Sequence, residues 1–467
     1  MKTDYASMGE TAKKGVEIML GDPKKAIAAF SIPIAVALFA QQSNNLVDSF
    51  WVTSLGAEAM AALGLVFPIY AVLIGIGSGL GIGTSAAIAR KIGMGRAEDA
   101  NRTAMQSLIL CIIISAIATP VLLVTAEPIL VAIGAGPTID ISMDYAVPLY
   151  LSTALILISG VMSGILRGEG AARKSMYIQV AAAATNLVLD PILIYTFDMG
   201  VAGAAWATVA AFAVSIIMGM YWYLAKKNMF LTLRREHMRF SMECQRDIMS
   251  VGLPQSVELS VMNLFNITFN FCIVMVGTTD ALAIYTVAWR IVYLLMIPAQ
   301  AMGGAIVSAC SAEFGMKRYD MIKKAYVFSV KSSVIILVAL SLVMALLAEP
   351  ISAVFTSSPD MEYLHNDMVV LLRIFAVFVP FMSLVFVGSS LLQAVKRSKV
   401  ALMSTVIRNL ALTVIFVAAA FLVGTLTSLW WAMTLSEIFG GLLMGYWAYI
   451  VLTDVAKRDA RAAERGK

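Results

Sequence analysis

An asparagine and an aspartate stand four residues apart in an apolar run of the chain, NLVLDPILIY (residues 186–195). On a helix, Asn186 and Asp190 share one face. Pro191 has no backbone N–H, so the carbonyl group of Leu187 loses its usual helical partner. A carboxylate, an amide oxygen and a freed carbonyl are suitable ligands for a hard monovalent cation, and the carboxylate can instead take up a proton. The stretch therefore predicts a site for Na⁺ or H⁺, with Pro191 as its hinge.

A second polar stripe comes earlier in the chain, in QQSNNLVDSFW (residues 41–51). Asp48 lies there with amide side chains at helical spacing, so these residues share a helix face. The amides are Gln41, Asn44 and Asn45. We expect them to line a substrate cavity beside the cation site.

The composition identifies the medium around these groups. Of the 467 residues, 60% are hydrophobic and 13% are charged, and the mean hydropathy is +0.85. A soluble domain carries about 25% charged residues. Most of this chain must therefore lie in lipid, where charged groups are costly and usually mark function.

Twelve segments are long and apolar enough to cross a membrane. They are residues 26–54, 59–89, 103–125, 145–166, 175–197, 200–225, 248–276, 281–311, 325–347, 368–394, 400–423 and 428–451. Thirty of the 34 lysines and arginines fall in alternate connections and in the two terminal segments, and the other connections carry only acidic charges. The positive-inside rule makes the basic side cytoplasmic. We expect a multi-pass protein of the plasma or inner membrane with both termini in the cytoplasm, and its net charge of +5 indicates topology and not nucleic-acid binding.

Depth along these spans brings the polar residues together. Asp48, Asp190 and Thr208 each lie roughly 11–12 Å from the outer end of their spans, at 1.5 Å per residue. Tyr145, at the outer start of the fourth span, can reach toward the same layer. The predicted cation site therefore consists of Asp48, Asn186, Asp190, Thr208 and Tyr145.

Other ionisable residues fall deep in the second half of the chain. Glu258 could meet a cationic substrate, add a second proton site, or pair with Arg290 or Arg408. Glu437 has the same alternatives. Arg290 is a further candidate for the cavity, and Arg290, Arg373 and Arg408 are expected to tie helices together.

The two halves of the chain repeat each other. KIGMGRAED (91–99) matches EFGMKRYDM (313–321), and three more pairs of motifs follow in the same order at offsets of 221 to 223. Each half holds six spans, which predicts a parallel repeat about a pseudo-two-fold axis and alternating access. The predicted parts are an N-terminal lobe (1–225), a basic cytoplasmic linker (226–247), a C-terminal lobe (248–453) and a cytoplasmic tail (454–467). The second half has Phe269 or Asn270 in place of Asp48 and Thr413 in place of Asp190, so the acidic site is expected in one lobe only.

Four stretches in this order resemble the multidrug and toxic compound extrusion (MATE) family, from about residue 20 to 450. They are NNLVDSFWVTSLGAEAMAALGLVFP (44–68), LRGEGAARKS (166–175), NLVLDPILIY and GVAGAAWATV (200–209). The resemblance implies an all-α integral membrane protein with twelve transmembrane helices in two six-helix lobes, V-shaped. It also implies an antiporter that exports cationic, amphiphilic drugs in exchange for inward Na⁺ or H⁺.

In the prokaryotic branch that this chain resembles most, the N-terminal lobe carries the cation site. By motif match the resemblance places that site at Asp48, Asn186, Asp190 and Thr208, with Tyr145 beside it. Another branch has an acid eight residues after the proline of span 7, where this chain has Met262. Span 10 has no acid after Asp367, so coupling through the second lobe in that manner is not expected.

Two other functions stay open. A flippase for lipid-linked oligosaccharides would need a basic cavity, for which Arg290, Arg373 and Arg408 are the deep candidates. A membrane-embedded transferase would need an aspartate-rich metal motif or a histidine cluster, and the sequence has no Asp-Asp pair and no His-Glu-x-x-His. The four cysteines show no paired spacing. We therefore predict a monomeric transporter of small molecules, without enzymatic activity, cofactor, nucleic-acid partner or metal other than Na⁺.

Overall fold

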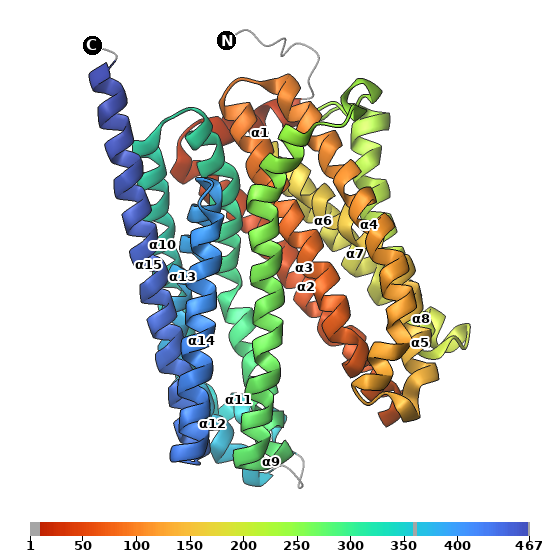
Figure 1. Cartoon of the computed structure of the whole chain (residues 1–467). Helices are drawn as coiled ribbons and strands as arrows, with labels where there is room; N and C mark the ends of the chain where they lie inside the picture. Colours follow the sequence, from red (N-terminus) through yellow and green to blue (C-terminus); the bar gives the residue numbers. More distant parts are fainter. Residues whose placement is uncertain (1–9, 358–361, 466–467) are drawn as a thin grey trace. The chain divides into compact units, whose positions relative to one another are not determined.

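The computed structural model describes residues 10–357 and 362–465, and every regular element in these ranges is a helix (Figure 1). Side chains are described in the same ranges except at residues 10–12, 45, 46, 48, 49, 53, 263, 264, 267 and 456–465. Ten helices of the described chain are long and apolar enough to cross a membrane, and the bent pair Gly136–Leu151 and Thr153–Gly168 makes an eleventh crossing.

One of these helices, α9 (Met242–Gly315), is 74 residues long. At 1.5 Å per residue it would be about 110 Å long if straight, against a hydrocarbon layer of about 30 Å. Its backbone breaks at Gly277 and Thr278, where the φ of Thr278 is +66°. Dividing α9 there gives twelve crossings, so the predicted all-α membrane fold is confirmed.

The chain forms two compact units. The first extends to Ser260 and includes Val307–Met316, and the second contains Val261–Ile306 and the chain from Lys317 onward. Besides parts of α9, the first unit holds α1 (Glu10–Leu20), α2 (Pro23–Thr53), α3 (Ala57–Gly93), α4 (Ala97–Ala132), α5 (Ile139–Leu151), α6 (Thr153–Gly168), α7 (Ala172–Pro191) and α8 (Gly200–Met220). Two π-helices, η3 (Ile192–Thr196) and η4 (Tyr221–Lys226), continue α7 and α8.

Glycines of α3 explain why the first unit includes pieces of α9. Gly79 and Gly83 are four residues apart and face the start of α9, where a Cβ at Gly83 would lie 2.7 Å from the backbone nitrogen of Gly252. Gly77 and Gly81 face α6, and a Cβ at Gly81 would lie 2.5 Å from the carbonyl oxygen of Gly160. Small residues at four-residue spacing let helix backbones touch in lipid. The glycines of α3 therefore form two packing faces, one against α9 and one against α6.

The repeated motifs of the two halves meet each other inside the first unit. Gly93 of α3 packs against the backbone of Ala312, and Gly315 packs in the same way against the backbone of Arg90. Since 93 and 315, and 90 and 312, are equivalent at the offset of 222, the two contacts are related by the repeat. Nearby, the hydroxyl groups of Ser85 and Ser308 lie 3.2 Å apart.

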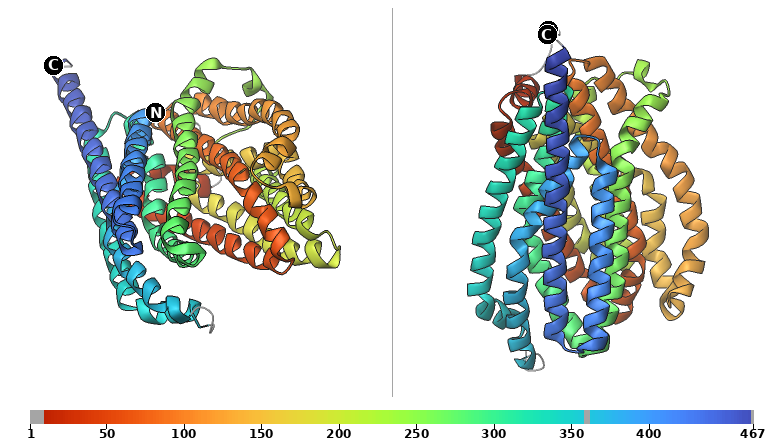
Figure 2. Two further views of the ribbon diagram at one scale, coloured as in Figure 1. Left: turned by 60° about the horizontal axis from the view of Figure 1, so that its bottom comes forward. Right: turned by 60° about the vertical axis from the view of Figure 1, so that its left-hand side comes forward.

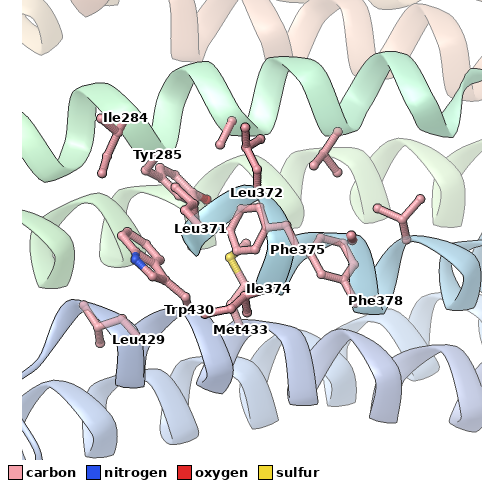
Figure 3. Close-up of a cluster of buried hydrophobic side chains, with 14 of the residues drawn as sticks. Ile284, Tyr285, Leu371, Leu372, Ile374, Phe375, Phe378, Leu429, Trp430 and Met433 are labelled. Carbon is pink, nitrogen blue, oxygen red and sulfur yellow. The ribbon is translucent and has the colours of Figure 1, made fainter. Parts of the chain in front are cut away.

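The second unit is built around an aromatic core (Figure 3). Tyr285 stacks on Trp430 with ring centroids 5.9 Å apart, and the edge of Phe375 meets both rings. Besides its part of α9, this unit holds α10 (Tyr319–Leu346), α11 (Ala348–Phe355), η6 (Glu362–Leu364), α12 (His365–Phe378), η7 (Val379–Phe381), α13 (Met382–Ala394), α14 (Ser398–Leu422) and α15 (Leu426–Arg465). Helices α14 and α15 lie side by side (Figure 2).

Two helices extend into segments that the sequence pattern left outside the lobes. Helix α9 begins at Met242, inside the predicted linker 226–247, directly after the extended residue Ser241. Helix α15 continues to Arg465, through most of the predicted tail 454–467. Hydropathy marks where a chain is apolar, and a helix can run past that point into polar surroundings.

The contact between α3 and α6 can be tested by adding a single methyl group. In Gly81→Ala the new Cβ collides with the carbonyl oxygen of Gly160, so we expect the variant to lose about 1–3 kcal/mol of stability. Gly64→Ala in the same helix is the control, because no atom lies within 4 Å of its new Cβ. Thermal unfolding of the purified protein in detergent measures both. A Gly81→Ala protein as stable as the Gly64→Ala protein would contradict the packing.

Candidate cation site

Three helices of the first unit carry the polar residues of the site. Helix α2 starts at Pro23, where the carboxylate of Asp22 accepts a hydrogen bond from the backbone N–H of Lys24 (2.9 Å). Helix α7 ends at Pro191, and the chain continues as the π-helix η3. Helix α8 packs directly on η3, since a Cβ at Gly203 would lie 2.7 Å from the carbonyl carbon of Leu193.

Asn186 is the centre of a hydrogen-bond network among these helices. Its amide nitrogen donates to Oδ1 of Asp190 (2.9 Å) and, at 3.5 Å, to the hydroxyl of Thr208 on α8. Its amide oxygen accepts from Nδ2 of Asn44 on α2 (2.6 Å). Asn186 is 2% exposed and Asp190 is 1% exposed. The network thus joins α2, α7 and α8 around a buried carboxylate.

The other residues expected at or beside the site have different outcomes. The side chains of Asp48 and Asn45 lie outside the described residues. Tyr145 is buried in an apolar cluster of the first unit, together with Tyr70, Leu149 and Tyr150. Gln41 is exposed. Asn44, an expected cavity residue, bonds directly to Asn186.

The chemistry of the network follows from its burial. An ionised carboxylate shielded from water is costly unless a charge compensates it. The sequence contains no lysine or arginine from residue 175 to residue 225, so neither α7 nor η3 nor α8 supplies a cation next to Asp190. The arrangement is suited to a proton or a small monovalent cation. Among the described side chains, no group of three or more His, Cys, Asp or Glu residues could hold a metal ion.

Tyr195 is a further residue of this region that the sequence did not single out. Its hydroxyl donates to the backbone carbonyl oxygen of Trp51 (2.8 Å) and also meets the hydroxyl of Ser54. The rings of Tyr195 and Trp51 meet edge to face, 6.1 Å apart. Because Tyr195 lies in η3, directly after Pro191, it links the end of α7 to the C-terminal end of α2.

The ionisable residues expected deep in the second half lie in both units. Glu258 is 6% exposed and belongs to the first unit, whereas Arg290 is exposed and belongs to the second. Arg408 pairs with Glu437 at 2.9 Å, buried between α14 and α15. Arg373 pairs with Glu349 at 2.9 Å on the surface of the unit. Arg373 and Arg408 therefore tie helices together.

Another buried carboxylate lies in the loop between α6 and α7, outside both spans. Glu169 is 2% exposed and accepts hydrogen bonds from the hydroxyl of Tyr223 (2.7 Å) and the backbone N–H of Leu231 (2.9 Å). Burial raises the pKa of Glu169 to about 7, although these hydrogen bonds and the charge of Lys174 oppose the rise. The motif LRGEGAARKS contains Glu169, but nothing in the motif shows that distant residues bury it.

The MatE family model matches residues 33–192 and 254–419 of the chain. The chain is also similar to the FAD transporter of Shewanella oneidensis, with 27% identity over 73% of this chain and 76% of that protein. Its identity with the multidrug export protein MepA of Staphylococcus haemolyticus is 23% over 91% of this chain and 93% of the relative.

Solved structures match over almost the whole chain. A crystal structure of MATE in complex with MaL6 has a TM-score of 0.91 and 32% identity, covering 95% of this chain and 99% of the other. A transporter of the MOP superfamily from Pyrococcus furiosus, described as having a binding pocket of reverse polarity, has a TM-score of 0.90 and 31% identity at the same coverage.

Glu169 should make the stability of the protein depend on pH. Its pKa is raised from 4.5 to about 7 in the folded state, so the folded chain binds this proton more tightly than the unfolded chain. Stability should therefore fall by up to about 3 kcal/mol as the pH rises from about 4.5 to about 7, and stay lower above that. The neutral variant Glu169→Gln should lack this loss. Its unfolding temperature in detergent should change less between pH 5 and pH 8 than that of the wild type.

The control for this measurement is Glu127→Gln, which removes an exposed carboxylate from α4. This variant should follow the pH dependence of the wild type. If Glu169→Gln also follows it, the raised pKa of Glu169 is wrong.

Proposed function

The chain belongs to the MatE family, and from that premise we propose that it is an antiporter that exports cationic amphiphilic compounds in exchange for inward H⁺ or Na⁺. Membership makes it a multi-pass membrane transporter and not an enzyme. The observation that carries the proposal is the buried Asp190, hydrogen-bonded to Asn186 in a stretch, residues 175–225, that contains no lysine or arginine.

Charge neutralisation at Asp190 is the proposed switch. An ionised carboxylate binds the amide of Asn186 more strongly than a neutral acid does. A proton or Na⁺ at Asp190 weakens this bond, and Asn186 passes the change to Asn44 on α2. Pro191 and η3 give α7 a place to bend, because a π-helix interrupts the regular hydrogen bonding of the α-helix. In this proposal Asp48, Thr208 and Tyr145 complete the ion site.

Competition between the ion and the substrate then drives export. A cationic compound is attracted to the same acidic region while the carboxylate is ionised, and it is released outward once a proton or Na⁺ neutralises that charge. Alternating access keeps the two binding events on opposite sides of the membrane. The proposed cavity residues are Gln41, Asn44, Asn45, Glu258 and Arg290.

The lack of basic residues around Asn186, Asp190 and Thr208 favours a cationic substrate over an anionic one. One relative is named an FAD transporter and several are named multidrug export proteins. Binding a dinucleotide or a lipid pyrophosphate calls for arginine or lysine at the site. The spans that carry Asn186, Asp190 and Thr208 have none from residue 175 to residue 225. The flippase function is disfavoured for the same reason.

Transport in vesicles tests the ion site. Asp190→Asn should reduce gradient-driven export of a fluorescent organic cation to the level of vesicles without the protein, because the neutral amide cannot exchange a proton or bind Na⁺ as a carboxylate does. Asp198→Asn is the matched control: Asp198 is exposed, and its φ of +53° suits asparagine as well. Imposing a pH gradient and a Na⁺ gradient separately identifies the coupling ion. Undiminished export by Asp190→Asn under both gradients would rule out this site.

A further inference from the structure

The segment between α8 and α9 exposes apolar and basic side chains side by side. Met238, Phe240 and Met242 are 52%, 56% and 68% exposed. Four exposed arginines accompany them along the same segment and the first turns of α9. We call these seven residues the linker surface: Arg234, Arg235, Met238, Arg239, Phe240, Met242 and Arg246.

The backbone below the linker surface is held by buried polar groups. Gln106 of α4, which is fully buried, donates to the carbonyl oxygens of His237 (3.1 Å) and Arg239 (2.9 Å). Its amide oxygen accepts from the backbone N–H of Ser241 (3.1 Å). His237 is itself buried and bonds through Nε2 to Glu98 (2.5 Å). These bonds fix the backbone from His237 to Ser241, while the side chains of Met238 and Phe240 stay exposed.

The exposure of these apolar residues is specific to this part of the segment. A few residues earlier, Met229, Phe230 and Leu231 are 4%, 7% and 2% exposed. The segment therefore buries its first group of apolar side chains, Met229–Leu231, and leaves its second group exposed. Exposed apolar side chains that are held in place next to charges mark an interaction site.

The position of the linker surface indicates what covers it. Helix α8 and η4 together span residues 200–226, which is about 40 Å at 1.5 Å per residue. This is longer than the hydrocarbon layer of about 30 Å, so the segment that follows lies at headgroup level. The exposed Tyr221 lies under the ammonium group of Lys226 (5.5 Å), as is typical of the membrane interface. Figure 1 shows the segment at the same end of the unit as α1.

The charge of this region favours an anionic partner. Lys226, Lys227 and the four arginines are exposed, against three exposed acids: Glu236, Glu243 and Glu98 of α4, which binds His237. We propose that the linker surface docks on the bilayer, with its arginines on anionic lipid headgroups and Met238, Phe240 and Met242 inserted at the boundary of the acyl chains. Basic and apolar residues together on a surface at this level are the combination that binds anionic membranes.

A fluorophore at position 238 tests this docking. All four native cysteines are buried, so Met238→Cys offers the exposed thiol for bimane labelling. The full-length protein is reconstituted into phosphatidylcholine vesicles with or without phosphatidylglycerol, each containing a lipid with a nitroxide near its headgroup. Quenching by that lipid should be about twofold or more stronger with phosphatidylglycerol, because each arginine at an anionic surface adds attraction.

Two charge variants of the labelled protein separate the linker surface from general basicity. Arg234→Gln, Arg235→Gln and Arg239→Gln together should remove the effect of phosphatidylglycerol. Lys396→Gln, Arg397→Gln and Lys399→Gln remove the same charge from exposed residues of the second unit and should leave the effect intact. Equal quenching with and without phosphatidylglycerol, or equal loss in both variants, overturns the proposal. So does quenching that varies with protein density in the membrane, which indicates a second copy as the partner.

Discussion

Direct contact between helix backbones holds the first unit together, and its other features depend on that contact. Lipid chains are as apolar as leucine, so helices in a membrane gain little from burying apolar side chains against one another. Helix α3 instead brings its own backbone against the backbones of α6 and of the first turns of α9 through two faces of glycines. Such contacts leave little freedom to slide or rotate. The frame they make is rigid enough to keep polar groups of α2, α7 and α8 at hydrogen-bond distance in the interior.

The two halves of the chain differ in what surrounds their buried charged side chains. In the first, Asp190 lies among amides and a hydroxyl, and residues 175–225 contain no lysine or arginine. In the second, the pair of residues that matches Thr185 and Asn186 is Arg408 and Asn409, and the guanidinium of Arg408 is bound to Glu437. A buried pair of opposite charges is neutral as a whole and needs no ion from outside. In the proposed function an ion from outside neutralises Asp190, whereas the second half neutralises its buried charge with its own side chains.

The spans, the all-helical class and the pairing of Asn186 with Asp190 could be predicted, because hydropathy and helical spacing are local properties of a sequence. The role of Asn44 could not, since a stripe of neighbouring amides does not reveal how its helix is rotated against a partner. Spacing alone also gave no sign that η3 would direct Tyr195 toward α2. Glu169 looked like a loop residue because the groups that bury it, Tyr223 and Leu231, come from a distant part of the chain. Contacts of this kind depend on the tertiary fold.

The paired contacts of Gly93 with Ala312 and of Gly315 with Arg90 constrain how the two halves of the chain can change. In a two-fold symmetric arrangement, residue i of one copy touches residue j of the other, and the reverse contact is also made. The two glycine contacts have this property at the offset of 222, although both halves belong to one polypeptide. A substitution at either glycine must therefore fit the backbone of the other half, so neither glycine can acquire a side chain unless the opposite helix shifts.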